Sequence, residues 1–598
     1  MILWYYSFTV LPTIISMETT LMASIVAKKR GKNVYYYYVE SVRKNGKPTI
    51  ANQKYLGTAA AVKAKLEASV DSLQTNAMYS DISQFGDIAF LYDIARRNGI
   101  VDLIDNVLPK RKQGASIGTY LLVEALNRAT APTSTVGLEK WYQNSCLPEI
   151  LGFKPSVFSP QNFWNNTAIS KDKLAQAEEA LLRQIVTAYN LDTSHIVYDA
   201  TNFLTYIDTA NEACTQAQRG HSKEKRKDLR IVGLSMMIAS DSGIPLLHDT
   251  YPGNRADATQ FALMLGKLKS RYEAVTGRTT DITVTFDRGN NSDKNIAFLR
   301  SCEQPMHFVG GLTKAQVSDL FDVPFSDYVP LTGDRLSGTS AYRIKRNVFG
   351  GEYTVVMIHN PVLEAGQLQG IRNNIAKADV NLKEIQEKLL KRAGGEVKKG
   401  RKPTAESITK SVEAALKAEY MSDIFSYKVV EDAEGTVVLS YVERSDGLEK
   451  VRSRYLGKMA LFTDRDDFTT EQIVLSYRAA WKIEAAFRQM KDTEHLSVRP
   501  IFHWTDEKIN VHLFSCVLAY RLCCLAVKEL ADKGISITIN DLLGGMSEIR
   551  RVTTFFGDLG GTRPQQVRTF SRGNETAEKI CSEYGLKDLY GKVGNRGK

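Results

Sequence analysis

The sequence predicts a multidomain α/β protein whose central part is a mixed β-sheet with helices on its faces. The chain has 598 residues, which is more than one hydrophobic core usually serves. Its hydrophobic share of 43% and charged share of 24% are those of ordinary folded protein. Between residues 194 and 312, strand-like and helical patterns alternate in an order that fits a mixed sheet.

Charge and cysteine content narrow the class of protein. The formal net charge of +11 favours a polyanionic partner such as nucleic acid. Seven cysteines without a CxxC pair do not form a disulfide framework or a cysteine-based zinc site. The apolar start has no Lys or Arg before Lys28 and is too short to cross a bilayer. We therefore expect a cytoplasmic protein with no membrane segment.

The first part of the chain reads as a small sheet followed by helices. Residues 22–58 contain β-rich runs separated by two turn signals, which predicts an antiparallel β module. The four tyrosines at 35–38 could line a half-buried strand or stack on bases. Residues 59–185 have apolar side chains at helical spacing, and we expect this helical segment to bind DNA. Its basic loop, residues 110–112, is either solvated or a phosphate contact.

The central stretch gives the most specific fold prediction. Three successive strands are followed by a helix, a strand, a helix and a final strand. In order, the segments are SHIVYDATNF, RIVGLSMMIAS, IPLLHDTYPG, DATQFALMLGKLKSRY, DITVTFDRG, NSDKNIAFLRSC and PMHFVGGL. This βββαβαβ order is that of the RNase H fold, so we predict an RNase H-like mixed-sheet core.

The order breaks down after Leu312, where a charged helical stretch and a hairpin predict an insertion. A long helix begins at Thr469, and a largely apolar helix follows that is better read as a packed core helix than as a membrane span. The predicted parts are a non-native or disordered extension at 1–21, the β module at 22–58, the helical DNA-binding region at 59–185, the core at 186–312 and 469–535, the insertion at 313–468, and a basic C-terminal region at 536–598.

Two aspartates lie where buried strands meet loops. Asp199 follows an apolar strand segment, and Asp287 follows another. If these two strands are neighbours in the sheet, both carboxylates point into one crevice. Hard divalent cations prefer such oxygen ligands. An aspartate at a strand end is also a common turn or cap residue, so each alone is weak evidence.

Glu484 is the third candidate carboxylate. Tyr477, Glu484 and Lys491 are spaced by seven residues, so in one continuous helix they share a stripe. A solvated helix face with an ordinary charge pair is the alternative interpretation.

These residues match a known family. The segment YRAAWKIEAAFRQMK resembles the signature Tyr-x2-Arg-x3-Glu-x6-Lys of DDE-type insertion-sequence transposases, with Ala480 at the arginine position. Arg478 or Arg488 could take over that contact. The segments YDATNFLTYID, RGHSKEKRKDL, GIPLLHDTYPGNRAD and FDRGNNSDKNI are similar to the subgroup with the RGHSK segment, in the same order. The resemblance extends from Met22 to about Val527.

The resemblance implies an enzyme that cuts and rejoins DNA. Asp199, Asp287 and Glu484 would bind two Mg²⁺ or Mn²⁺ ions. Tyr477, Lys491 and Arg488 would contact DNA. The partners would be double-stranded DNA, as transposon ends and target, and a second copy of the chain in a synaptic homodimer.

Three further residues of the basic segment after Asp199 are candidate DNA contacts: Lys223, Lys225 and Arg226. A solvated loop is the alternative for this segment. Two other functions stay open: a metal-dependent nuclease without strand transfer, and a catalytically inactive DNA-binding repressor. The repressor alternative stays open because Ala480 occupies the arginine position of the signature.

Overall fold

The structure is a computed structural model that describes residues 22–591, except 45–46, 76, 110–113, 223, 256, 302–304, 398–399, 401, 433–434 and 557–564. The predicted extension at 1–21, the basic loop at 110–112 and Lys223 therefore lie outside the described residues. The chain divides into two compact units, Met1–Ser83 with Arg551–Ser571, and Gln84–Arg550 with Arg572–Lys598.

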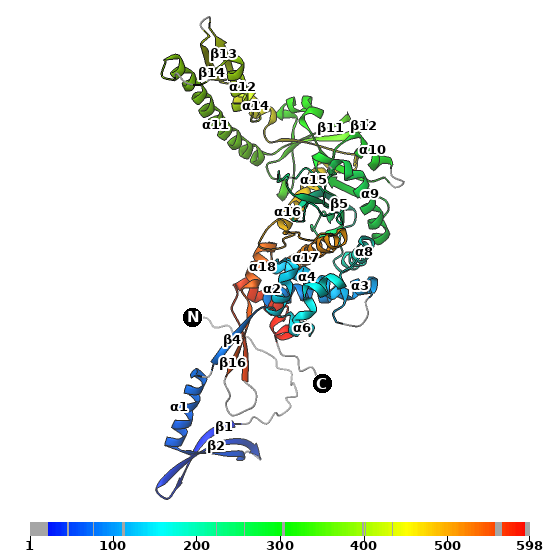
Figure 1. The fold of residues 1–598 in the computed structure, drawn as a ribbon. Coiled ribbons are helices and arrows are strands. Elements are labelled where there is room, and N and C mark those ends of the chain that lie inside the picture. The colour runs from blue at the N-terminus through cyan, green and yellow to red at the C-terminus, as the bar shows by residue number, and fades with distance from the viewer. Residues whose placement is uncertain are drawn as a thin grey trace, which may run out of the picture. The chain divides into compact units, whose positions relative to one another are not determined.

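Unit 1 contains two small antiparallel sheets (Figure 1). The first has the order β1-β2-β3, formed by β1 (Met22–Arg30), β2 (Asn33–Lys44) and β3 (Lys47–Thr58). Helix α1 (Ala59–Thr75) follows β3 directly. The second sheet has the order β17-β16-β4, formed by β4 (Ala77–Gln84), β16 (Arg550–Phe556) and β17 (Gln565–Phe570). The C-terminal stretch thus returns to pair with a strand near the start of the chain.

Unit 2 begins with seven helices: α2 (Gly86–Arg97), α3 (Ile100–Val107), α4 (Ile117–Thr130), α5 (Thr135–Gln143), α6 (Leu147–Leu151), α7 (Pro160–Asn166) and α8 (Lys171–Ala188). Ser116 and Ser170 cap α4 and α8 by accepting hydrogen bonds from Thr119 N and Lys173 N, which satisfies otherwise unpaired amides. Nearly every residue of α4 is buried, and α4 packs against α17 (Asp506–Asp532). These helices therefore share a core with the rest of unit 2.

Helix α17 is long and apolar enough to cross a bilayer by length and composition. Its most apolar stretch is entirely buried inside unit 2. A core helix passes the same length and composition test, and this burial agrees with the sequence interpretation.

The centre of unit 2 is a nine-stranded mixed sheet of order β10-β11-β12-β15-β9-β8-β5-β6-β7. Its middle strands are β5 (His195–Thr205), β6 (Arg230–Ala239), β7 (Pro245–Pro252), β8 (Thr283–Phe286) and β9 (His307–Leu312), with α9 (Asp257–Thr276) and α10 (Asp293–Ser301) between them in the chain. Strand β5 is antiparallel to β6 and parallel to β8, and β8 is parallel to β9. The strand and helix order agrees with the βββαβαβ prediction.

The sheet extends into the stretch predicted as an insertion. Strands β10 (Val329–Pro330), β11 (Ser340–Val348), β12 (Gly351–His359) and β15 (Lys458–Thr463) continue it beyond β9. Six short 3₁₀ turns occur among the described residues: η1 (Pro155–Phe158), η2 (Arg288–Asn290), η3 (Lys314–Gln316), η4 (Ser318–Asp322), η5 (Phe325–Asp327) and η6 (Asp334–Leu336).

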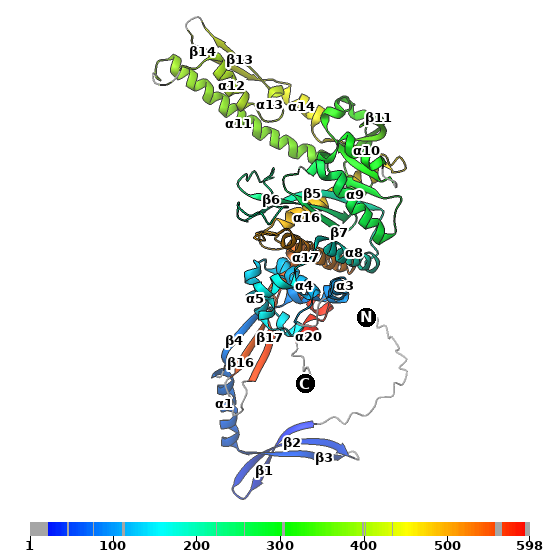
Figure 2. The same cartoon turned by 45° about the vertical axis from the view of Figure 1, so that its right-hand side comes forward.

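Between β12 and β15 the chain forms a subdomain with its own hydrophobic core (Figure 2). It consists of α11 (Pro361–Ala393), α12 (Ala405–Ala415), α13 (Met421–Ile424), β13 (Phe425–Glu431), β14 (Val437–Glu443) and α14 (Gly447–Tyr455). Leu382, Val412 and Ile424 are fully buried in this core, although they come from three different helices. We call residues 360–457 the insertion subdomain.

The helix predicted from Thr469 is two helices in the structure, α15 (Thr470–Arg478) and α16 (Ala480–Met490). The interruption is one residue, Ala479, whose backbone stays in the helical region. Lys482 N donates to Ala479 O three residues back, which tightens the turn there. The chain then continues through α17 to α18 (Ile539–Ser547), α19 (Glu575–Glu583) and α20 (Leu586–Tyr590).

Candidate active site

Asp199 and Asp287 lie at matching positions on neighbouring strands. The parallel register of β5 and β8 runs from His195–Thr283 to Tyr198–Phe286, so the next residue on each strand is an aspartate. Neighbouring strands are about 4.8 Å apart, so these two positions bring the carboxylates close together. Asp287 directly follows β8, as predicted, but Asp199 lies inside β5 and not where a strand meets a loop, because the strand stays buried and extended as far as Thr205. Asp287 is the N-cap residue of η2, yet its side chain makes no capping hydrogen bond. A helix-capping role therefore does not account for Asp287.

The face of the sheet that carries Asp199 follows from strand alternation. Tyr198 packs edge-on against Phe261 of α9, so its neighbour Asp199 points to the opposite face. Thr201, two residues on, shares that face with Asp199, and α16 packs against β5. Lys491, at the end of α16, donates from Nζ to Thr201 Oγ1 at 2.7 Å. Lys491 is therefore held on the Asp199 face of the sheet.

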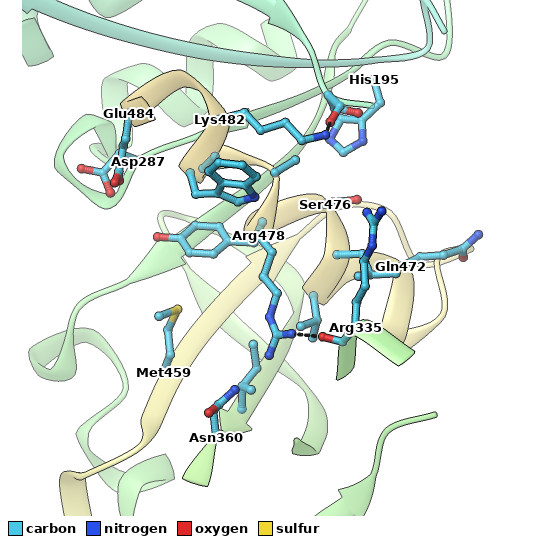
Figure 3. Close-up of a pocket in the computed structure, with 18 of the residues that line it drawn as sticks. His195, Asp287, Arg335, Asn360, Met459, Gln472, Ser476, Arg478, Lys482 and Glu484 are labelled. Atoms are coloured by element: carbon cyan, nitrogen blue, oxygen red, sulfur yellow. Dashed lines mark hydrogen bonds between the residues drawn. The ribbon is translucent and has the colours of Figure 1, made fainter. Parts of the chain in front are cut away.

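Glu484 is on the exposed side of α16, whereas Ile483, Phe487 and Met490 are buried. A cavity of about 1380 Å³ is lined by both Glu484 and Asp287. Figure 3 draws both carboxylates among the residues that line this cavity. Two of the three predicted carboxylates thus open onto one space, and Asp199 lies on the strand beside Asp287.

Tyr477 of α15 packs against strand β9. A Cβ added at Gly311 of β9 would be 2.5 Å from the Tyr477 hydroxyl, so the glycine leaves the space that the ring occupies. Burial, together with the negative charges of Asp287 and Glu484, raises the pKa of Tyr477 to about 12. The phenol is therefore protonated at neutral pH and can donate a hydrogen bond.

The predicted cationic residues differ in their surroundings. Arg488 is exposed on α16. Arg226 is exposed and forms a two-point contact with Asp228, from Nε to Oδ1 at 2.8 Å and from Nη2 to Oδ2 at 2.5 Å. Lys225 is exposed and has a positive φ of 59°. Lys223 lies outside the described residues, so its predicted DNA contact stays a prediction.

The cavity also contains residues that the sequence interpretation did not select. Trp481 is 62% exposed and lines the cavity. Arg335 and His195 line it as well. Burial lowers the pKa of His195 to about 4, so this ring is neutral, and its Nε2 is 2.9 Å from Thr285 Oγ1. Trp481 precedes Glu484 by three residues, about one helical turn, so its position in the sequence already indicated that both side chains are on the same side of the helix.

The two cations suggested as replacements at position 480 are not equivalent. Arg478 donates to the carbonyl oxygen of Arg335 and, at 3.0 Å, to Thr339 Oγ1 (Figure 3). Its guanidinium is therefore engaged with the loop before β11. Arg488 has an exposed side chain, and Ala480 itself lines the cavity.

A buried cluster outside the cavity contains potential metal ligands. Among the described residues, donor atoms of Glu124, His503 and His512 all lie within 4.8 Å of one another. Within the same described ranges, Asp199, Asp287 and Glu484 do not form such a group. The His512 Nε2 atom donates to Val498 O at 2.8 Å, and Nδ1 is 3.4 Å from Glu124 Oε1. These contacts join α4 to α17 within the core.

Comparisons with known proteins identify the family. The family described as a transposase DDE domain matches residues 190–522, which span the central sheet, the insertion subdomain and α15 to α17. No curated protein matches the chain. A solved structure of the piggyBac transposase synaptic complex with hairpin DNA is similar at a TM-score of 0.36 and 8% identity, covering 79% of this chain and 82% of that chain. That structural likeness is too low to carry an argument, whereas the family match covers more than half of the sequence. The chain belongs to the DDE-domain transposase family.

Proposed function

We propose that this transposase binds the terminal inverted repeats of an insertion sequence and catalyses metal-dependent cleavage and strand transfer by cut-and-paste transposition. Asp199, Asp287 and Glu484 are the catalytic carboxylates of this proposal, on an RNase H-like core. The observation that supports it most is that Asp199 and Asp287 each come directly after the last paired residues of β5 and β8, Tyr198 and Phe286. Glu484 opens onto the same cavity as Asp287.

The three carboxylates suit a pair of Mg²⁺ or Mn²⁺ ions. Their donors are hard oxygen atoms, and Asp287 and Glu484 are exposed to solvent, as ions that keep several waters require. When bound, such ions stabilise the charge that develops on the attacking and leaving oxygens of a phosphodiester. Asp199, Asp287 and Glu484 would hold them.

The neighbouring residues position the substrate in this proposal. The protonated Tyr477 hydroxyl donates a hydrogen bond to a phosphate oxygen next to the carboxylates. The Lys491 ammonium, held by Thr201 on the Asp199 face, attracts the same backbone. Phosphodiester transfer to water or to a 3′-hydroxyl needs no covalent enzyme intermediate, so no nucleophilic Ser or Cys is required.

The partners proposed are duplex DNA, as element ends and target, and a second copy of the chain. Two ends must be cut in one complex, which favours a homodimer. Arg488 and the exposed Lys225 and Arg226 are additional proposed DNA contacts. The position of Ala480 in the cavity wall favours one alternative, a DNA-binding protein that no longer cleaves.

Strand transfer separates a transposase from a nuclease. A donor end with a free 3′-hydroxyl is incubated with supercoiled target plasmid and Mg²⁺. The proposal predicts joined products for the wild type and none for Asp287→Asn, while the exposed control Asp293→Asn still joins. Hydrolysed ends without joined products would instead identify a nuclease, and DNA binding without either product would identify a repressor.

A further inference from the structure

The positive charge of the chain is concentrated in the first sheet of unit 1. Residues 22–58 contain eight Lys and Arg residues and one acidic residue, Glu40. This segment therefore has a net charge of +7, and the whole chain has +11. A short segment with most of the net charge is the electrostatic pattern of a surface that binds a polyanion.

One face of this sheet combines cations with tyrosines. Lys28 pairs with Tyr35, and Tyr37 pairs with Tyr55, and side chains of directly paired residues lie on the same face. The Lys28 ammonium donates to Gln53 Oε1 at 2.9 Å and is 5.1 Å from the centre of the Tyr37 ring. The Tyr55 ring is 5.2 Å from that of Tyr37 and 6.0 Å from that of Tyr35. We call these five residues the tyrosine face.

The only acidic residue of the segment lies on the opposite face. Glu40 accepts hydrogen bonds from Tyr38 at 2.9 Å and from Asn52 at 3.3 Å. Tyr38 is next to Tyr37 along β2, so strand alternation places the Glu40 cluster on the other side. At Gly57, which pairs with Tyr36, an added Cβ would be 2.9 Å from Ala61 Cβ of α1. Helix α1 is therefore on the Glu40 side, and the tyrosine face has no acidic side chain.

The tyrosine face is exposed along β1 and at Tyr55, whereas Tyr35 and Tyr37 are half-buried and Val39 beside them is buried. Tyr55 is 54% exposed, and every described residue of β1 from Ala23 to Arg30 is exposed. A three-stranded sheet is about 10 Å wide, since strands are about 4.8 Å apart. The major groove of duplex DNA is about 12 Å wide and admits β-strands.

We propose that the tyrosine face binds duplex DNA at the element ends, with Lys28 and Arg30 neutralising phosphates and the tyrosine rings packing on the sugar–phosphate edge. Arg30 shares the face of Lys28 because it is two residues further along β1. This inference rests on the proposed function, because it names the surface that recognises the substrate. It assigns that role to the β module and not to the helical segment at 59–185.

The test compares two double variants that lose the same charge. Lys28→Gln with Arg30→Gln changes the tyrosine face, and Lys29→Gln with Lys54→Gln changes the opposite face. Binding of the full-length protein to a labelled terminal-repeat duplex is measured by fluorescence anisotropy over a range of salt concentrations. We expect the tyrosine-face variant to bind at least about 10-fold more weakly, with the salt slope reduced by about 2, and the control to change less than about 3-fold.

A third variant tests the rings. Tyr55→Ala should weaken binding about 10-fold with little change in salt slope, because it removes stacking area and no charge. Limited proteolysis of each variant checks that the module stays folded. Equal loss of affinity in both double variants would overturn the proposal, as would tighter binding to single-stranded DNA than to duplex.

Plasmid nicking with Mn²⁺ by the same proteins separates this inference from the proposed function. If both double variants bind like the wild type, and if the wild type and both double variants nick the plasmid, the DNA site is wrong and the enzyme assignment stands. If the tyrosine-face variant loses binding but the wild type does not nick, the DNA site stands and the enzyme assignment fails.

Discussion

Gly311 shows how one residue of β9 sets the position of a side chain in the candidate site. The Tyr477 hydroxyl occupies the space that a Cβ at this glycine would fill. The charges of Asp287 and Glu484 both contribute to the raised pKa of Tyr477, so the position of the ring relative to the two carboxylates matters.

Gly311→Ala should therefore lower the DNA cleavage rate by about 10- to 100-fold, because a displacement of about 1 Å at an active site costs that much. DNA affinity should change little. Gly370→Ala, at a helical position in α11 with open space around it, is the matched control and should cleave normally. A Gly311→Ala enzyme of wild-type rate would show that the Tyr477 position is unimportant.

His512 predicts a pH dependence of stability. Burial lowers the pKa of His512, but the neighbouring Cys516 and Glu124 raise it more, to about 9 from 6.5. The protonated ring therefore stabilises the fold fully below pH 6.5, and this contribution is lost as the pH rises through 9. The difference in free energy of unfolding between wild type and His512→Gln should shrink by up to about 3 kcal/mol from pH 6.5 to 9.

Chemical unfolding at several pH values, compared between the two proteins, measures this difference. A difference that grows with pH would mean that His512 is neutral in the folded protein.

Some site residues were predictable from the sequence, and others were not. Asp199 and Asp287 each follow a short apolar run, and Glu484 lies in a spaced signature, so local pattern and resemblance were enough to select them. The pattern did not show that Asp199 lies inside β5, which continues to Thr205. Arg335 reaches the same cavity from a part of the chain far from all three carboxylates, and His195 reaches it from the start of β5, far from Glu484. Their contribution depends on long-range strand pairing, which a single sequence does not encode in any local pattern.

At the scale of elements, strands β5 to β9 were predicted because each is an apolar run bounded by turn signals. Strand β11 was missed, since its sequence SAYRIKRNV alternates charged, exposed residues with partly buried ones. The break at Ala479 was also missed, because both sides keep helical spacing and the interruption is a single residue. Lys491 is consequently at the end of α16 rather than inside a continuous helix.

The sheet register predicts that the insertion subdomain can be removed. His359, the last residue of β12, pairs directly with Lys458, the first residue of β15. A two-residue Asn-Gly turn could therefore replace residues 360–457 and close a hairpin. Because the subdomain has its own core, the remaining protein should stay folded, with a melting temperature lowered by less than about 5 °C.

Differential scanning calorimetry of the shortened protein measures the melting temperature, and circular dichroism checks its secondary structure. An insoluble or unfolded product would show that the central sheet needs the subdomain. Cleavage should be reduced, since Val362 and Leu363 of α11 line the cavity.

At the scale of the whole molecule, no sequence feature predicted that the C-terminal region pairs with β4. Strands β16 and β17 complete a sheet with residues more than 460 positions earlier, and no local pattern specifies such a partner. The helical segment was predicted as a region of its own, whereas α4 packs against α17 and α8 against α9 within unit 2. Charge was the one global property that pointed to a partner.

The central claim is that three carboxylates on a common core make this family member an active transposase. The most direct measurement is cleavage of a labelled duplex carrying the element's own ends, with Mg²⁺, by wild type, Glu484→Gln and the exposed control Glu494→Gln. We predict nicking at the repeat boundary by the wild type and the control, and a loss of at least about 1000-fold in Glu484→Gln, with DNA binding retained. Cleavage by Glu484→Gln at the wild-type rate would contradict the assignment of the third carboxylate.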